Sequence, residues 1–149
     1  MLNAEPTYTG DVWVHRINPD GSRELVYEEH NLVVSTGKNL AASRLIANTD
    51  GVLSHIGVGS GQTAADITQT ALVTPLGANK PFDSAATRNN NVVTAVATFN
   101  AGEATGTIWE FGLFNALSAG TMFSRSVGAA GIPKGANDVI AVTWQVTAN

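Results

Sequence analysis

The chain has 149 residues, which suffices for one domain with its own core and leaves little room for a second. Only 13% of the residues are charged and the net charge is −4, so no basic surface is expected for nucleic acid or anionic lipid. Cysteine is absent, which excludes disulfides and thiolate metal sites, and no stretch approaches the roughly 18 apolar residues of a membrane-spanning helix. The start, with Glu5 and Pro6, lacks the apolar stretch of a signal peptide, so we expect synthesis in a cytoplasm.

The chain opens with a predicted β-hairpin. Residues 9–17 alternate in side-chain type, as a strand does, and residues 23–34 form the second predicted strand. Between them, Pro19 fixes φ and Gly21 can take a positive φ, which predicts a tight turn. Residues 1–9 are then an N-terminal arm, and residues 10–149 are a single β domain.

A helix is predicted after the hairpin. Ser35 and Thr36 can cap its start, and helical spacing of apolar residues predicts one amphipathic helix at about 37–48. Residues 52–58 are typical of a short buried strand that runs into a glycine-rich segment at 57–61. A brief second helical turn is predicted at 63–72.

The second half of the chain is dominated by strands. Residues 74–91 are rich in Pro, Gly, Asn and Asp, which predicts a long surface loop with room for one edge strand. Strands are predicted at 91–99, 105–114, 121–127 and 138–147, the middle two forming a hairpin. If its turn is centred between Leu117 and Ser118, Glu110 lies opposite Arg125 as a cross-strand pair of opposite charge.

Residues 108–114 are apolar on both faces of a predicted strand. Trp109, Phe111 and Leu113 would share one face, with Ile108 and Phe114 on the other. Two interpretations remain open: a central strand covered by a sheet and a helix, or a face that pairs with another subunit. About seven strands and one short helix, without regular βα alternation, predict a mainly β fold, an antiparallel β-sandwich or jelly-roll-like module.

Motifs for catalysis and cofactor binding fail on spacing. The glycines at 57, 59 and 61 give G-x-G-x-G instead of a nucleotide-binding G-x-G-x-x-G, so a tight turn is the preferred interpretation. Ser60 lies outside a G-x-S-x-G elbow, and Glu28 and Glu29 point to opposite faces of their strand. No catalytic, cofactor-binding or metal-binding residue is predicted, including among the three histidines, which lie on separate segments: His15, His30 and His55.

The order of the segments resembles a group of small tailed-bacteriophage virion proteins and the adaptor domains at the start of phage tail fibres. Residues 31–40 look like the group's "N-x-[IV]-[VT]-x-x-G-x-N-L" entry into its helix, and residues 55–61 look like its "I-x-[LV]-G-x-G" strand and turn. Residues 108–114 resemble its "I-x-E-[IFA]-G-L-F" strand. Further similar segments follow at 120–125 and 142–146, so the resemblance covers about residues 28–147.

The resemblance implies a non-enzymatic virion protein without cofactors, forming homo-oligomers and contacting the major capsid protein or tail proteins after assembly in the host cytoplasm. Because no stalk or receptor-binding tip follows the last strand, a capsid decoration or cement subunit is preferred. A tail-fibre adaptor or baseplate subunit is the first alternative. A carbohydrate-binding or receptor-binding module is the second, with Trp13, Tyr27 or Phe82 stacking on sugar rings.

Candidate docking residues come from three regions. The arm and the 74–91 loop are polar, irregular and lack an evident internal partner, and the strand at 108–114 is apolar on both faces. The residues singled out are Met1, Leu2, Asn3, Pro6, Tyr8, Phe82, Arg88, Trp109 and Phe111.

Overall fold

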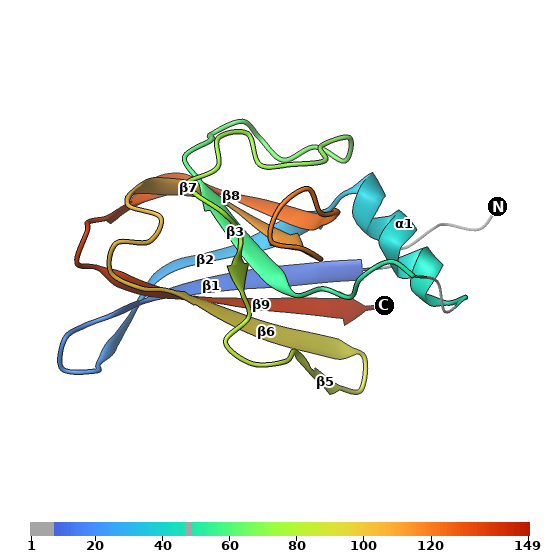
Figure 1. Cartoon of the computed structure of the whole chain (residues 1–149), viewed down its shortest axis with the longest axis horizontal. Helices are drawn as coiled ribbons and strands as arrows, with labels where there is room; N and C mark the ends of the chain where they lie inside the picture. The colour runs from blue at the N-terminus through green and yellow to red at the C-terminus, as the bar shows by residue number, and fades with distance from the viewer. Residues whose placement is uncertain (1–7, 47–48) are drawn as a thin grey trace.

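The computed structural model describes residues 8–46 and 49–149, so Met1, Leu2, Asn3 and Pro6 of the expected arm lie outside the described residues. Within the described ranges, nine antiparallel strands form one sheet in the order β4-β3-β7-β8-β2-β1-β9-β6-β5. The sheet curls until its two halves face each other across a shared hydrophobic core (Figure 1). The predicted mainly β fold with one helix is confirmed.

One half of the sheet contains the opening hairpin. Its strands are β1 (Tyr8–Ile17), β2 (Arg23–Val33), β9 (Val139–Ala148), β6 (Val92–Phe99) and β5 (Thr87–Asn89). The predicted turn is present: the N–H of Gly21 donates to the carbonyl of Asn18 at 2.9 Å, and Gly21 has a φ of 84°. Because β1 begins at Tyr8, Tyr8 and Thr9 belong to this strand instead of an arm.

The other half of the sheet consists of β3 (His55–Gly59), β4 (Lys80–Pro81), β7 (Gly106–Phe114) and β8 (Met122–Lys134). The two halves are joined through β2, which pairs with β1 from Arg23 to Asn31 and with β8 at Leu32 and Val33. β8 continues well beyond the predicted end at residue 127. The sequence pattern does not predict this extension, because the small residues at 128–131 show no alternation of apolar and polar side chains.

The helix α1 (Ser35–Arg44) begins earlier and ends sooner than the predicted 37–48. Its N-cap residue is Val34, whose side chain has no oxygen to cap the helix, and the hydroxyl of Thr36 donates to the carbonyl of Met122 at 2.7 Å. Only Gly37 and Leu40 of the helix are buried, a narrower apolar face than an amphipathic helix presents. The predicted last residues, Ala47 and Asn48, lie outside the described residues.

The segment at 63–72 has no helix, contrary to the prediction. Asp66 instead closes a local turn, because its carboxylate accepts a hydrogen bond from the N–H of Thr68 at 2.8 Å. This polar side chain competes with the hydrogen bonds of a helix, which is the physical reason for the error.

The segment at 74–91 covers edges of the sheet and includes two short strands, β4 and β5. Along β3, the N–H of Ser60 donates to Thr74 at 2.8 Å and that of Leu76 donates to Val58 at 2.9 Å. Along β6, the N–H of Asp83 donates to Val96 at 2.8 Å. Strand edges left open invite pairing with other chains, so this segment protects both ends of the sheet.

Candidate functional site

A buried ion pair joins β7 and β8. The carboxylate of Glu110 accepts hydrogen bonds from Nη2 and Nε of Arg125 at 2.8 and 3.0 Å, and both side chains are 0% exposed. The predicted pair therefore exists, but the predicted register is wrong. Glu110 lies opposite Val127, and Arg125 lies opposite Gly112, because the register shifts between Leu113 and Phe114 near the hairpin turn.

The same pair holds the segment 61–74 on the outer face of β7 and β8. Oε1 of Glu110 accepts from the N–H of Gly61 at 3.1 Å and of Thr74 at 2.7 Å, and Oε2 accepts from the N–H of Val73 at 2.9 Å. Nη1 of Arg125 donates to the carbonyl of Thr63 at 2.8 Å. A buried charge is tolerable only when paired and hydrogen-bonded, and this pair meets both conditions.

The glycines of the 57–61 run provide space for this segment. A Cβ on Gly59 would lie 2.5 Å from the carbonyl oxygen of Thr74, and one on Gly61 would lie 2.6 Å from Oε1 of Glu110. Neither residue has a positive φ. The preferred interpretation of a tight turn is therefore replaced by close packing: these glycines let another segment approach the strand.

The two faces of β7 differ from the predicted ones. Ile108, Phe111 and Leu113 all belong to the central core, while Phe114 packs on the other side in a smaller cluster. A bulge between Ile108 and Glu110 reverses the alternation and leaves Trp109 half-buried. β7 is a central strand, as the first interpretation held, but residues 61–74 cover its outer face in place of a helix.

The other candidate docking residues are not grouped on one part of the structure. Phe111 is 0% exposed and is unavailable for docking. Tyr8 is half-buried, with its ring edge-on to Phe123 at a centroid distance of 5.9 Å. Arg88 is exposed on β5 and donates to the carbonyl of Asn90 at 2.7 Å, and Phe82 is half-buried at the pocket described next.

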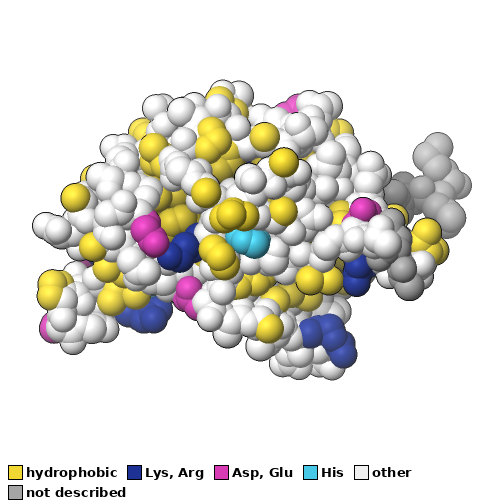
Figure 2. All heavy atoms as spheres, viewed as in Figure 1, with side chains coloured by type: hydrophobic (Ala, Val, Ile, Leu, Met, Phe, Trp, Pro, Cys, Tyr) yellow, Lys and Arg dark blue, Asp and Glu magenta, His cyan; other side chains and the backbone are white. Residues whose placement is uncertain are grey.

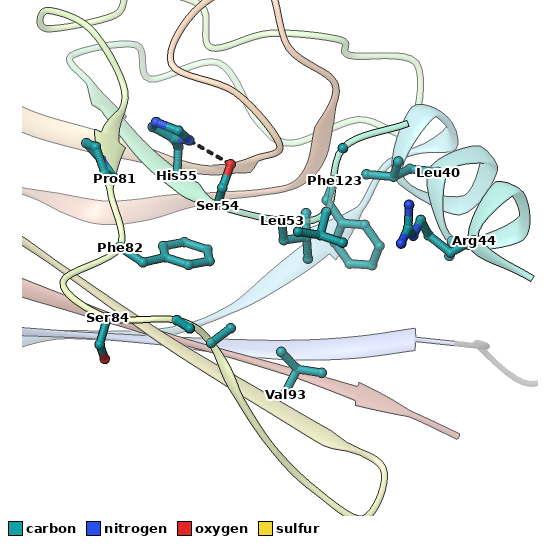
Figure 3. A pocket seen from close by; sticks show the side chains of 15 residues that line it. Leu40, Arg44, Leu53, Ser54, His55, Pro81, Phe82, Ser84, Val93 and Phe123 are labelled. Atoms are coloured by element: carbon teal, nitrogen blue, oxygen red, sulfur yellow. Dashed lines mark hydrogen bonds between the residues drawn. The ribbon is translucent and has the colours of Figure 1, made fainter. Parts of the chain in front are cut away.

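An apolar pocket of about 690 Å³ opens between α1, the segment before β3, the segment after β4, and β6. Figure 3 shows Leu53, Phe82 and Phe123 around it, with Arg44 from α1 at one end. The sequence did not reveal this pocket, since its walls come from five separate segments, β8 among them through Phe123. The lining residues are Leu40, Ala41, Arg44, Gly51, Val52, Leu53, Ser54, His55, Pro81, Phe82, Ser84, Ala85, Ala86, Val93 and Phe123.

Exposed apolar side chains adjoin this pocket. Val52 lines it and is 60% exposed, while Leu45 and Ile46 directly follow α1 and are 85% and 79% exposed. Figure 2 shows hydrophobic side chains scattered across this face of the molecule, with charged side chains at several places among them. A concave apolar surface with an apolar rim is typical of a site that receives side chains of another molecule.

A serine and a histidine form the polar part of the pocket wall. Oγ of Ser54 and Nδ1 of His55 lie 2.7 Å apart, as Figure 3 shows, and partial burial lowers the pKa of His55 below its ordinary value. A nucleophilic serine needs a base that a third group orients. Among the described residues, His55 has no hydrogen-bond partner except Ser54, so this third group is missing from the described site.

The histidines are not brought together. His30 pairs with Asp11 at 2.5 Å on the surface, far along the chain from His55 in the pocket. In residues 8–46 and 49–149, no group of three or more His, Asp or Glu residues has the arrangement of a metal site. Within the same ranges, no helix has the length and apolar character needed to cross a membrane.

The aromatic residues named for sugar stacking are also dispersed. Tyr27 is only 8% exposed, and its hydroxyl shares a 2.7 Å hydrogen bond with Ser126 in the interior. Trp13 is half-buried on β1, and Phe82 lies in the pocket. A sugar platform of stacked aromatics is therefore not formed by these three residues.

No protein-family model matches the chain, and no curated protein or solved structure matches it. The pocket and the buried ion pair are therefore interpreted from their own geometry.

Proposed function

We propose that the protein is a non-enzymatic structural subunit of a tailed-bacteriophage particle, of the capsid decoration or cement type. Two kinds of observation support the proposal. The segments at 31–40, 55–61 and 108–114 resemble, in their motifs and order, those expected of small phage virion proteins. The observation that carries it is the apolar pocket, which has the exposed Val52 in its wall.

The proposed mechanism is burial of an apolar side chain of a neighbouring particle protein in the pocket. Fully burying one aliphatic or aromatic side chain contributes about 1.5–3 kcal/mol. A single contact of this size binds weakly. Many copies on one shell add their contacts, and a homo-oligomeric subunit adds further avidity, so the particle as a whole is stabilised.

The proposed partners are other copies of this chain and the major capsid protein or tail proteins, and the proposed location is the virion after assembly in the host cytoplasm. A tail-fibre adaptor or baseplate subunit would use the same docking chemistry. The two placements differ in where the protein lies on the particle.

The test is electron microscopy of purified particles on which the tagged protein carries a gold label. Label over the shell supports decoration, label confined to the tail supports the adaptor alternative, and particles without label contradict both.

The Val52→Asp variant should reduce labelling, because it places a charge at the pocket. Leu117→Asp is a matched control, since Leu117 is 53% exposed, as against 60% for Val52, and lies outside the pocket lining. Equal labelling by both variants would remove the pocket from the mechanism.

A further inference from the structure

The most exposed apolar side chains belong to one region of the molecule. Among the large hydrophobic side chains at positions 8–46 and 49–149, those of Leu45, Ile46 and Val52 have the three highest exposed fractions. Val52 lines the apolar pocket, as does Arg44, the residue directly before Leu45. Exposed apolar residues that gather in this way mark interaction sites, whereas isolated ones are ordinary on a protein surface.

Leu45 and Ile46 form a protrusion with a fixed backbone. The N–H of Leu45 donates to the carbonyl of Ala42 at 3.1 Å. The N–H of Ile46 donates to the carbonyl of Ser43 at 3.2 Å. These bonds continue the helical turn past the end of α1, so both side chains are presented to solvent from an ordered backbone. We call them the apolar knob. A side chain presented in this way loses little backbone freedom when it binds.

The apolar pocket begins on the same helix that carries the knob. Leu40, Ala41 and Arg44 of α1 form part of its wall, and Figure 3 shows Leu40 and Arg44 at one end. Arg44 is the only Lys, Arg, Asp or Glu among the described residues of the lining. A cavity of about 690 Å³ with mostly apolar walls is suited to uncharged apolar side chains.

α1 itself is only partly covered by the rest of the chain. Gly37 and Leu40 are its buried residues, and a helix of 10 residues depends on packing for most of its stability. A partner that covers the knob and the pocket would therefore also cover part of this helix.

A knob and a pocket on the same helix make this surface self-complementary. In a dimer with two-fold symmetry the same patch of both subunits is in contact, so a residue that contacts a site on the partner is matched by the reverse contact. The knob of each copy then enters the pocket of the other. A different protein would have to supply both a matching side chain and a matching cavity, whereas a second copy supplies both.

We propose that two copies of the chain form a two-fold symmetric dimer in which Leu45 and Ile46 of each copy occupy the apolar pocket of the other. This inference rests on the proposed function in taking the pocket as a docking site, and it names the occupant as a second copy of the chain.

The first test is sedimentation of the full chain from micromolar to millimolar concentrations, which should show a monomer–dimer equilibrium. The double variant Leu45→Ser with Ile46→Ser should raise the dissociation constant of the dimer at least roughly a hundredfold, because four large apolar side chains per dimer lose their burial. Ile67→Ser with Leu117→Ser is the matched control. It removes the same number of exposed apolar side chains outside the pocket lining and should leave the dissociation constant unchanged.

The second test locates the contact by disulfide cross-linking, since the chain has no cysteine of its own. Ala86 lines the pocket and is exposed. Mixing Ile46→Cys protein with Ala86→Cys protein under mild oxidation should therefore join residues 46 and 86 of two different copies. Mixing Ile46→Cys with Leu117→Cys should not join residues 46 and 117, because Leu117 lies outside the pocket lining.

Three results would overturn the inference: a chain that remains monomeric over the whole concentration series, a dimer that the double variant leaves intact, or equal cross-linking of residue 46 to residues 86 and 117. The labelling of particles is a separate measurement. A monomeric chain that labels particles and loses label in Val52→Asp would overturn this inference alone. A dimer joined through residues 46 and 86, together with particles that carry no label, would support this inference and contradict the placement on a phage particle.

Discussion

Glu110 and Arg125 form a buried ion pair although they are not opposite each other in the ladder. Arg125 faces Gly112, which has no side chain, and this leaves its guanidinium free to extend diagonally to the carboxylate of Glu110 at 2.8 Å. The carboxylate also accepts three backbone N–H groups, from Gly61, Val73 and Thr74. The pair thus connects the β7–β8 hairpin with a segment that has no regular structure of its own.

Breaking this ion pair should strongly destabilise the protein. Arg125→Met leaves the Glu110 carboxylate buried without its cation, so the free energy of unfolding in urea should fall by about 3–5 kcal/mol. The Lys80–Glu103 pair provides the comparison, because its side chains are 25% and 40% exposed. Lys80→Met should cost no more than about 1 kcal/mol. Similar losses in the two variants would contradict the role assigned to burial.

Removing the carboxylate should also release the covering segment. In Glu110→Ala the N–H groups of Gly61, Val73 and Thr74 lose their acceptor, so their hydrogen exchange should accelerate more than that of β1 and β9 amides. The measurement is native-state hydrogen exchange followed by nuclear magnetic resonance. A uniform acceleration over the whole chain would mean that Glu110 supports only global stability.

Gly59→Ala should destabilise the protein because the added methyl group would lie 2.5 Å from the carbonyl oxygen of Thr74. Overpacking of this kind costs about 1–3 kcal/mol in thermal or urea unfolding. Gly51→Ala is the control, since its Cβ would meet the nearest atom, the carbonyl oxygen of Asn115, at 3.4 Å. The control should change stability by less than about 0.5 kcal/mol, and a loss as large as that of Gly59→Ala would show that space at Gly59 is not the cause.

Two aromatic residues of β7, Phe111 and Trp109, should respond differently to truncation. Phe111 is 0% exposed and stacks with Tyr27 at a ring-centroid distance of 4.7 Å, so Phe111→Ala should cost about 3–5 kcal/mol. Trp109 is half-buried outside the core, so Trp109→Ala should cost clearly less. Urea unfolding checks both, and equal costs would place Trp109 in the core.

Alkaline pH should weaken the fold through Tyr27. Burial raises the pKa of this hydroxyl from 10.0 to about 12, so the folded state favours the neutral form. The resulting stability is present below pH 10 and is lost as the pH rises through the folded pKa of about 12. Unfolding measured between these values, with tyrosinate absorbance, should show the decline. Tyr27→Phe should reduce the slope, and an unchanged slope would assign the alkaline loss to other groups.

Several features could be predicted from local sequence. The hairpin turn at 18–21 and the alternation in β1, β6 and β9 depend on neighbouring residues, and these three predicted strands lie within a few residues of the observed ones. The pair of Glu110 and Arg125 is predicted by placing the hairpin turn between Leu117 and Ser118, which sets the two opposite charges across from each other. The register between them was missed, because a bulge shifts partners without leaving a signal in side-chain type.

The sequence by itself determined a mainly β fold, one helix after the opening hairpin and the pairing of Glu110 with Arg125, since side-chain periodicity and turn position are local properties. Only the tertiary structure decided the apolar pocket and the covering of β7 by residues 61–74. Each of these joins segments far apart in the chain. The contacts between such segments depend on the order of the strands in the sheet and on how far the sheet curls. No local sequence pattern specifies either of these features.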